Sequence, residues 1–88
     1  MKHELKTWPK YFRAVSNGSK TFEIRKDDRG FKVGDVLKLN EYKPGRSVFG
    51  KDGYTGKSVN AGVYYILRDA EKFGVERGFV VMAIKLLP

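Results

Sequence analysis

The chain has no cysteine, a single histidine and only three prolines among its 88 residues. Without cysteine there can be no disulfide framework, thiolate metal site or cysteine nucleophile. One histidine excludes the usual zinc sites that use several histidines. No phosphate-loop motif is present, so the sequence predicts neither a metal nor a cofactor.

Long apolar runs are also missing. No segment approaches the roughly 18 uninterrupted apolar residues that a membrane-crossing helix needs. The first residues do not follow the basic-then-apolar pattern of a signal peptide. The sequence therefore predicts no membrane partner, and the expected location is the cytoplasm.

Acidic residues are few relative to basic ones. Ten Asp and Glu stand against 18 Lys and Arg, which gives a formal net charge of +8. Such an excess attracts polyanions through counterion release and long-range steering, although a basic surface also simply aids solubility. The excess is uneven, because five basic residues and one acid lie between Tyr42 and Arg68. This distribution favours a nucleic-acid partner.

What is present suits one small folded domain over residues 1–88. Hydrophobic residues make up 41% of the chain, which argues for one packed core. Helical spacing of Tyr11, Phe12 and Val15 predicts a helix that begins near Pro9 and ends at Gly18. Apolar patterns predict strands at 3–7, 20–26, 36–42, 58–67 and 79–86. One helix and about five strands predict a mostly β (α+β) fold, a small antiparallel barrel.

Two segments depart from simple strand patterns. Residues 43–57 show no periodicity, and five of the fifteen are Gly or Pro, which predicts a long loop or loose hairpin with its tip near 51–53. This segment interleaves Phe49 and Tyr54 with basic residues, a composition that suits stacking on single-stranded nucleic acid. Folding of these rings onto the barrel is an equal alternative. In the following strand, Gly62 predicts a bulge or bend.

The most informative stretch is residues 18–25, Gly-Ser-Lys-Thr-Phe-Glu-Ile-Arg. Strand alternation predicts that Phe22 and Ile24 face the core, while Glu23 and Arg25 share the opposite face. An acid and a base on rigid backbone suit a binding or catalytic site. A solvated strand face with a weak ion pair would give the same pattern.

Gly18, Lys20, Glu23 and Arg25 match the G-x-K-x-x-E-x-R signature of ASCH domains, which belong to the PUA-like superfamily. The chain resembles short bacterial and phage ASCH-like proteins over nearly its whole length. The resemblance implies a PUA-like barrel and an RNA or nucleotide-like ligand. It also implies a cleft beside the barrel that is lined by the three charged motif residues. Further matching segments are 3–6, 8–12, 31–35 and 65–69.

The chemistry of the motif side chains is compatible with this function. Arg25 can fork onto a phosphate or a base edge, and Lys20 can act as a point charge on phosphate. Glu23 can accept hydrogen bonds from an amino group or orient Arg25. Lys20 joins the other two only if the chain bends after Gly18.

Several charged or titratable residues outside the motif are further candidates. His3 is the only side chain with an ordinary pKa near neutrality, and it either lines the cleft or is a terminal surface residue. Asp27 is interpreted as a turn residue that bonds nearby backbone, whereas the resemblance places Asp28 and Arg29 at the cleft rim. The predicted ligand- or RNA-binding residues are His3, Lys20, Glu23, Arg25, Asp28, Arg29, Lys51, Lys57 and Arg68.

A hydrolase is the alternative function. Some ASCH-like proteins are amidohydrolases on acetylated cytidine that use a Lys and a Thr of this strand with a distant Glu. Lys20 matches the lysine, but Glu23 stands in the place of the threonine and Thr21 comes two residues too early. Asp69 and Glu71 are candidates for the distant carboxylate. The departure favours a binding module over a hydrolase acting on a modified nucleoside. An interaction module whose basic face meets an acidic protein is a third possibility.

Overall fold

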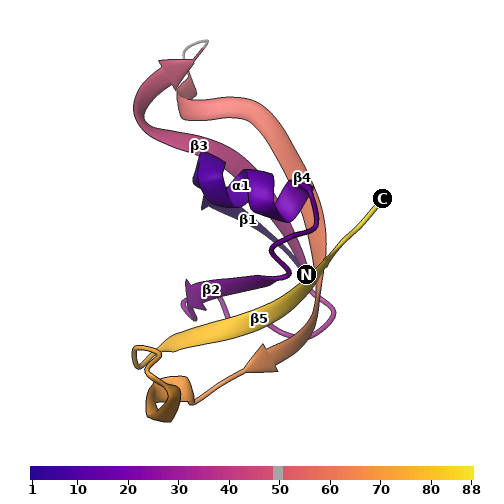
Figure 1. Cartoon of the computed structure of the whole chain (residues 1–88), viewed down its shortest axis with the longest axis vertical. Helices are drawn as coiled ribbons and strands as arrows, with labels where there is room; N and C mark the ends of the chain where they lie inside the picture. Colours follow the sequence, from indigo (N-terminus) through magenta and orange to yellow (C-terminus); the bar gives the residue numbers. More distant parts are fainter. Residues whose placement is uncertain (49–50) are drawn as a thin grey trace.

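A computed structural model describes the backbone of residues 1–48 and 51–88, and the side chains of residues 1–45 and 53–88. The described chain is mostly β, as predicted, with five strands and one α-helix (Figure 1). The short 3-10 helix η1 (Ala70–Phe73) lies between the last two strands. Phe49, predicted to stack on bases, lies outside the described residues. The other elements are β1 (Lys2–Thr7), α1 (Pro9–Ser16), β2 (Phe22–Lys26), β3 (Val36–Val48), β4 (Lys51–Leu67) and β5 (Phe79–Leu86).

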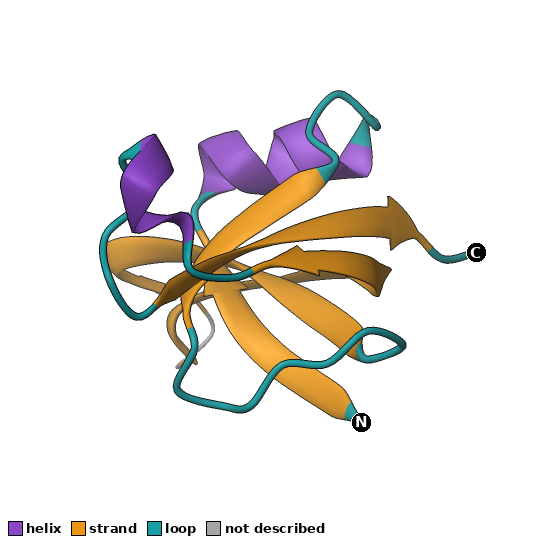
Figure 2. Ribbon diagram, turned by 90° about the horizontal axis from the view of Figure 1, so that it is seen from below, coloured by secondary structure: helices purple, strands orange, loops and turns teal. Residues whose placement is uncertain are grey.

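The five strands form one curled sheet in the order β1-β3-β4-β5-β2. Three of the pairings are antiparallel, as predicted. The pairing of β1 with β3 is parallel, and in this it departs from the predicted antiparallel barrel. The curl brings the two edge strands, β1 and β2, to face each other across an opening (Figures 1 and 2). The sheet is therefore a half-barrel and not a closed barrel.

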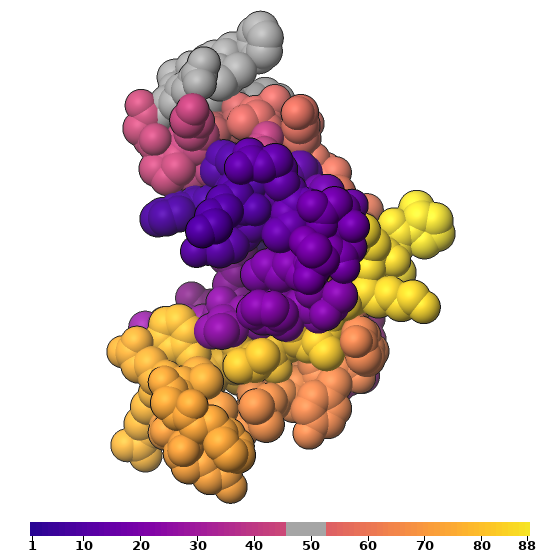
Figure 3. All heavy atoms as spheres, in the orientation of Figure 1, coloured from indigo at the N-terminus to yellow at the C-terminus, as the bar shows by residue number. Residues whose placement is uncertain are grey.

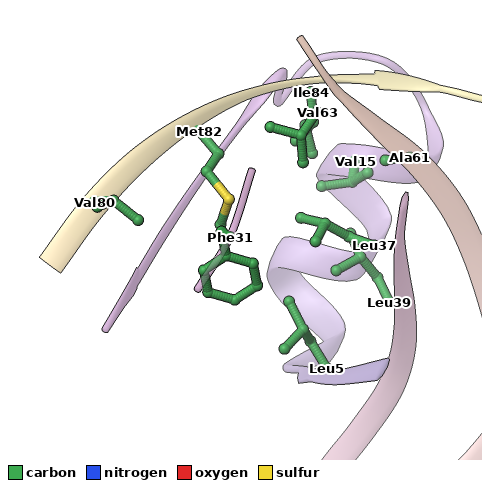
Figure 4. Close-up of a cluster of buried hydrophobic side chains, with 10 residues drawn as sticks. All are labelled: Leu5, Val15, Phe31, Leu37, Leu39, Ala61, Val63, Val80, Met82 and Ile84. Atoms are coloured by element: carbon green, nitrogen blue, oxygen red, sulfur yellow. The ribbon is translucent and has the colours of Figure 1, made fainter. Parts of the chain in front are cut away.

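The core fills the concave side of the sheet beneath α1 (Figure 4). Leu37 and Leu39 of β3 are fully buried, as the alternation predicted. Phe12 and Val15 of α1 are buried, whereas Tyr11, the third residue of the predicted stripe, is 45% exposed. The cluster of buried core residues is Leu5, Val15, Phe31, Leu37, Leu39, Ala61, Val63, Val80, Met82 and Ile84.

Of the two alternatives predicted for residues 43–57, the hairpin is confirmed and the loop is wrong. Strand β3 reaches Val48, β4 begins at Lys51, and the two strands pair antiparallel. Periodicity failed as a guide here because the ladder between the strands is irregular. Its register shifts twice, between Asn40 and Tyr42 and between Tyr42 and Ser47. Gly53 and Gly56 have positive φ values of 80° and 90°, which break the alternation of side chains without ending the pairing.

Strand β4 has the predicted bulge, but it lies just after Gly62 and not at it. The register against β5 shifts between Val63 and Tyr65. Val63 is buried and Tyr65 is 60% exposed, because the extra residue reverses the faces beyond it. Among the described residues, no helix has the length and apolar character needed to cross a membrane.

Candidate binding cleft

A cleft of about 700 Å³ lies between the facing edges of β1 and β2. Figure 3 shows the surface hollowed between the N-terminal segment and the segments around β2 and the start of β5. The strand edges do not pair with each other across this gap. Two arginine side chains span it instead: Arg25 Nη2 donates to the Lys6 carbonyl at 2.8 Å, and Arg29 Nη1 donates to the Glu4 carbonyl at 2.8 Å. These contacts bridge the opening of the half-barrel.

A charged network built on Glu23 lies in this cleft. Glu23 is only 3% exposed. Its Oε1 accepts a hydrogen bond from Lys20 Nζ at 2.7 Å, and its Oε2 accepts one from Arg25 Nε at 3.0 Å. Burying a carboxylate is costly unless it is paired and hydrogen-bonded, and both conditions are met here. Because both oxygens accept from cations and the side chain is buried, Glu23 positions two cations and is little accessible to a ligand.

Lys20 reaches this network because the chain turns before β2. Gly18 has a φ of 83°, a conformation that favours glycine and ends α1 as the sequence predicted. Asn17 Oδ1 then accepts a hydrogen bond from the Ser19 backbone at 2.9 Å, and the Lys20 backbone donates to the Ala14 carbonyl at 2.9 Å. This turn frees Lys20 from strand alternation. The bend after Gly18, which Lys20 needs in order to join Glu23 and Arg25, is therefore present.

The predicted faces of β2 are reversed. Glu23 pairs with Met82 in the ladder and shares its buried side, while Phe22 and Ile24 are 45% and 48% exposed. The physical reason is that β2 is an edge strand beside the gap. Its concave face meets the opening and not a packed apolar layer, so the polar side chains point inward. Alternation itself holds, but the core does not extend under this strand.

Exposed aromatic rings surround the network. Trp8 is 58% exposed, and Tyr11 and Phe22 are each 45% exposed, and all three line the cleft. Lys20 Nζ lies 4.9 Å from the centre of the Phe22 ring and 5.6 Å from that of Tyr11, which are cation–π distances. Sequence reasoning missed Trp8 and Tyr11 as site residues. The available indication was that both flank Pro9, where the predicted strand at 3–7 gives way to the predicted helix.

Cations outnumber acids in the lining of the cleft. Asp28 and Arg29, predicted at the rim, do line it, and the Arg29 Nε lies 4.0 Å from the Asp28 carboxylate. The charged lining residues are Lys6, Lys20, Arg25, Lys26 and Arg29 against Glu23 and Asp28, a net charge of +3. The cleft therefore combines a positive field with accessible rings.

His3 does not line the cleft, and it is not a surface residue either. It is 6% exposed, its Nε2 lies 2.8 Å from Asp35 Oδ2, and its ring packs edge-on against Phe31. The hydrogen bond from His3, together with that from the N-terminal ammonium group, lowers the pKa of Asp35 to about 2. The prediction for His3 was wrong because His3 lies on the buried face of β1, together with Leu5 and Thr7, although it is near the first residue of the chain.

Two further predicted residues, Arg68 and Lys57, do not line the cleft. Arg68 donates to Asp27 Oδ2 at 2.8 Å and to the Phe31 carbonyl at 2.6 Å, so it tethers the turn after β2. Asp27 also accepts from the Phe31 backbone at 3.1 Å, which confirms its interpretation as a turn residue. Lys57 is exposed beside a different hollow. The side chain of Lys51 lies outside the described residues. Within the described part of the chain, no cluster of three or more His, Asp or Glu side chains suits a metal ion.

Comparison with known proteins places the chain in a family. Residues 2–84 match the family described as a domain of unknown function (DUF3850). The chain belongs to this family. It is 41% identical over 59 residues to an uncharacterized 12.9 kDa protein in the GpA 3′ region of Escherichia phage P2. That match covers 67% of this chain and 48% of the phage protein, so the chain spans about half the length of this relative.

A solved structure shares the fold. The crystal structure of hypothetical protein PH0355 superimposes on this DUF3850 chain with a TM-score of 0.63. The match covers 99% of this chain and 100% of that one, at 20% sequence identity. The likeness supports the curled five-strand architecture.

Proposed function

We propose that the cleft between β1 and β2 binds single-stranded RNA or a nucleotide-like ligand. One observation carries the proposal: exposed rings of Trp8, Tyr11 and Phe22 border the same cleft as a cation cluster of net charge +3. Aromatic rings stack on bases of any sequence, and cations neutralise the backbone phosphates. The same proposal includes membership of the ASCH and PUA-like group, which the G-x-K-x-x-E-x-R motif suggests. It also includes a cytoplasmic location.

Arg25 is the residue best placed to contact a phosphate or a base edge. Its Nε is held by Glu23 and its Nη2 by the Lys6 carbonyl, so the guanidinium plane is fixed. Its Nη1 makes no hydrogen bond to the described residues, and the side chain is 26% exposed. A fixed fork loses little freedom when it binds an oxyanion. Glu23 then acts as a positioning residue for Arg25.

The geometry favours binding over the alternative hydrolase. Lys20 Nζ donates to Glu23 and to the Phe22 carbonyl at 2.8 Å, so the amine is engaged as a donor to two oxygens. A nucleophile or base needs a free lone pair on that nitrogen. Asp69 and Glu71, the candidates for the distant carboxylate, do not line the cleft. The three groups which that reaction uses are therefore not assembled around Lys20.

The chain carries its own reporter for this proposal. Trp8 is its only tryptophan and lines the cleft, so stacking of a base on it should quench its fluorescence. We expect quenching by an oligouridine of about ten nucleotides at low salt. Arg25→Ala should weaken binding by roughly 10- to 100-fold, because a charged hydrogen bond contributes about 1.5–3 kcal/mol.

Two controls make the test decisive. Arg25→Lys keeps the charge but loses the fork, and should recover only part of the affinity. Lys72→Ala removes a cation from η1, outside the cleft lining, and should bind like the unaltered protein. Absence of quenching, or equal affinity of Arg25→Ala and Lys72→Ala with both folded by circular dichroism, would overturn the proposal.

A further inference from the structure

A second hollow, of about 520 Å³, lies beside the base of the β3–β4 hairpin. It is separate from the cleft between β1 and β2 and shares only Leu5 with its lining. Two cations and an aromatic ring border it, with one exposed acid. Its polar and aromatic lining includes Glu4, Lys38, Asn40, Tyr54 and Lys57.

This hollow is shaped by a large bulge in β4. Asn40 pairs with Ser58 and Tyr42 pairs with Tyr54, so residues 55–57 of β4 stand opposite Glu41 alone. The bulge is fixed internally: the Thr55 hydroxyl donates to the buried Glu41 carboxylate at 2.7 Å, and the Lys57 backbone donates to the Thr55 hydroxyl at 3.3 Å. Bulges re-aim side chains and recur beside functional sites. This one brings Lys57 to the rim of the hollow.

The aromatic wall of the hollow is fixed as well. The rings of Tyr42 and Tyr54 meet edge to face, with their centres 5.1 Å apart. A glycine makes room for them: a Cβ at Gly53 would lie 2.5 Å from Tyr42 Cε2. Lys6 Nζ lies 4.6 Å from the centre of the Tyr42 ring and 5.8 Å from that of Tyr54. Lys6 also lines the first cleft, so this one cation lies near both that cleft and the rings beside the hollow.

We propose that this hollow is a second subsite for a single-stranded polynucleotide, with a base against Tyr54 and a backbone phosphate between Lys38 and Lys57. Charge supports the choice, because Glu4 is the one acid among the described residues that line the hollow, and it is 67% exposed and 3.9 Å from Lys38. The inference rests on the function proposed for the first cleft and makes it more specific. The ligand is a strand that passes Lys6 from one site to the other, and not a single nucleotide.

The test compares ligands of two lengths. Fluorescence anisotropy is measured with a labelled uridine dinucleotide and with an oligouridine of about ten nucleotides, over a range of salt. In the double variant Lys38→Ala/Lys57→Ala we expect unchanged dinucleotide affinity. Affinity for the longer strand should fall at least about 5-fold, and its log–log salt slope should flatten by about 0.7, the value for the one phosphate that the variant no longer neutralises.

Matched variants separate this site from a general loss of charge. Lys72→Ala/Arg77→Ala removes the same charge from residues around η1, at the opposite end of the molecule from the β3–β4 hairpin (Figure 1). It should leave the affinity for the longer strand within about 2-fold and retain a steeper salt slope than the Lys38/Lys57 variant. Tyr54→Ala should weaken only the longer strand, by roughly 5- to 100-fold, and Tyr54→Phe, which keeps the ring, should restore it.

Two outcomes would overturn the inference, and they differ from failure of the first site. The subsite is refuted if the longer strand binds no tighter than the dinucleotide. It is also refuted if the Lys38/Lys57 variant and its control show the same affinity and slope. In either case, dinucleotide binding that Arg25→Ala abolishes would leave the proposed function standing. If neither ligand binds the unaltered protein, the proposed function fails and the second subsite fails with it.

Discussion

Replacing the buried carboxylate of Glu23 with an amide should strongly destabilise the fold. Glu23→Gln keeps the size of the side chain but removes its charge and one of its two acceptor oxygens. Lys20 and Arg25, whose side chains are only 16% and 26% exposed, would then share one acceptor and face an amide donor. A partly buried cation would lose its partner, which is the costly way to break a buried ion pair.

The magnitude follows from the two contacts. Each hydrogen bond to a charged group contributes about 1.5–3 kcal/mol, and breaking a fully buried pair costs about 3–5 kcal/mol. Lys20 and Arg25 retain some access to water, so the expected loss in unfolding free energy is about 2–4 kcal/mol. For a domain of this size, that loss corresponds to a fall in Tm of roughly 10–25 °C.

Urea unfolding followed by far-UV circular dichroism measures this loss. Glu71→Gln is the matched control, because its carboxylate lies 4.0 Å from an arginine but is 44% exposed. It should change the unfolding free energy by less than about 0.5 kcal/mol. Adding Lys20→Met to Glu23→Gln should restore part of the loss, since the orphaned cation is removed. A Glu23→Gln protein as stable as the Glu71→Gln control would refute the buried network.

Three further outcomes are expected. Gly53→Ala, which forces φ of 80° on a residue with a Cβ and places that Cβ against the Tyr42 ring, should lower stability in urea unfolding by at least about 1 kcal/mol more than Gly74→Ala. At Gly74 φ is 91° but nothing lies within 4 Å, and an equal loss in the two variants would contradict the steric argument. The pKa of Asp35 is lowered from 3.8 to about 2, so its charged form stabilises the fold above pH 3.8 and that stabilisation, about 2 kcal/mol, is lost as the pH falls toward 2. Urea midpoints from about pH 2 to pH 6 should therefore show the stability gap between the unaltered protein and Asp35→Asn closing with acid, and a constant gap would refute it. Acetylated cytidine should not be deacetylated at neutral pH when the products are followed by chromatography, because Lys20 is held as a donor by its partners, and turnover abolished by Lys20→Ala would restore the hydrolase.

The elements of the fold could be predicted where a local rule was decisive. Helical spacing followed by Gly18 fixed the end of α1, and strict alternation buried Leu37 and Leu39. The parallel pairing of β1 with β3 could not be predicted, because pairing between distant strands leaves no local pattern. Residues 43–57 could not be assigned to a hairpin over a loop from the sequence, because positive-φ glycines hide the period of two on which strand prediction depends.

The candidate site was predictable in its motif and not in its surroundings. Lys20, Glu23 and Arg25 meet in one cleft, as the motif indicated. The prediction of which face of β2 points outward was wrong. Alternation shows which residues share a face but not which face is covered by the rest of the protein. Trp8 was missed because the edge of β1 comes near β2 only through the curl of the whole sheet. That the cleft formed by these residues binds a ligand stays a prediction.

The central claim, that a polynucleotide lies in the cleft between β1 and β2, is tested most directly by NMR. A ¹⁵N–¹H correlation spectrum of the labelled protein is recorded while an oligouridine of about ten nucleotides is added. We predict that the largest shifts fall on backbone amides of residues 5–8, 10–12 and 20–29 and on the Trp8 indole, with smaller ones on residues 54–58. Shifts confined to η1 and the outer face of β5, or no shifts at low salt, would contradict the claim.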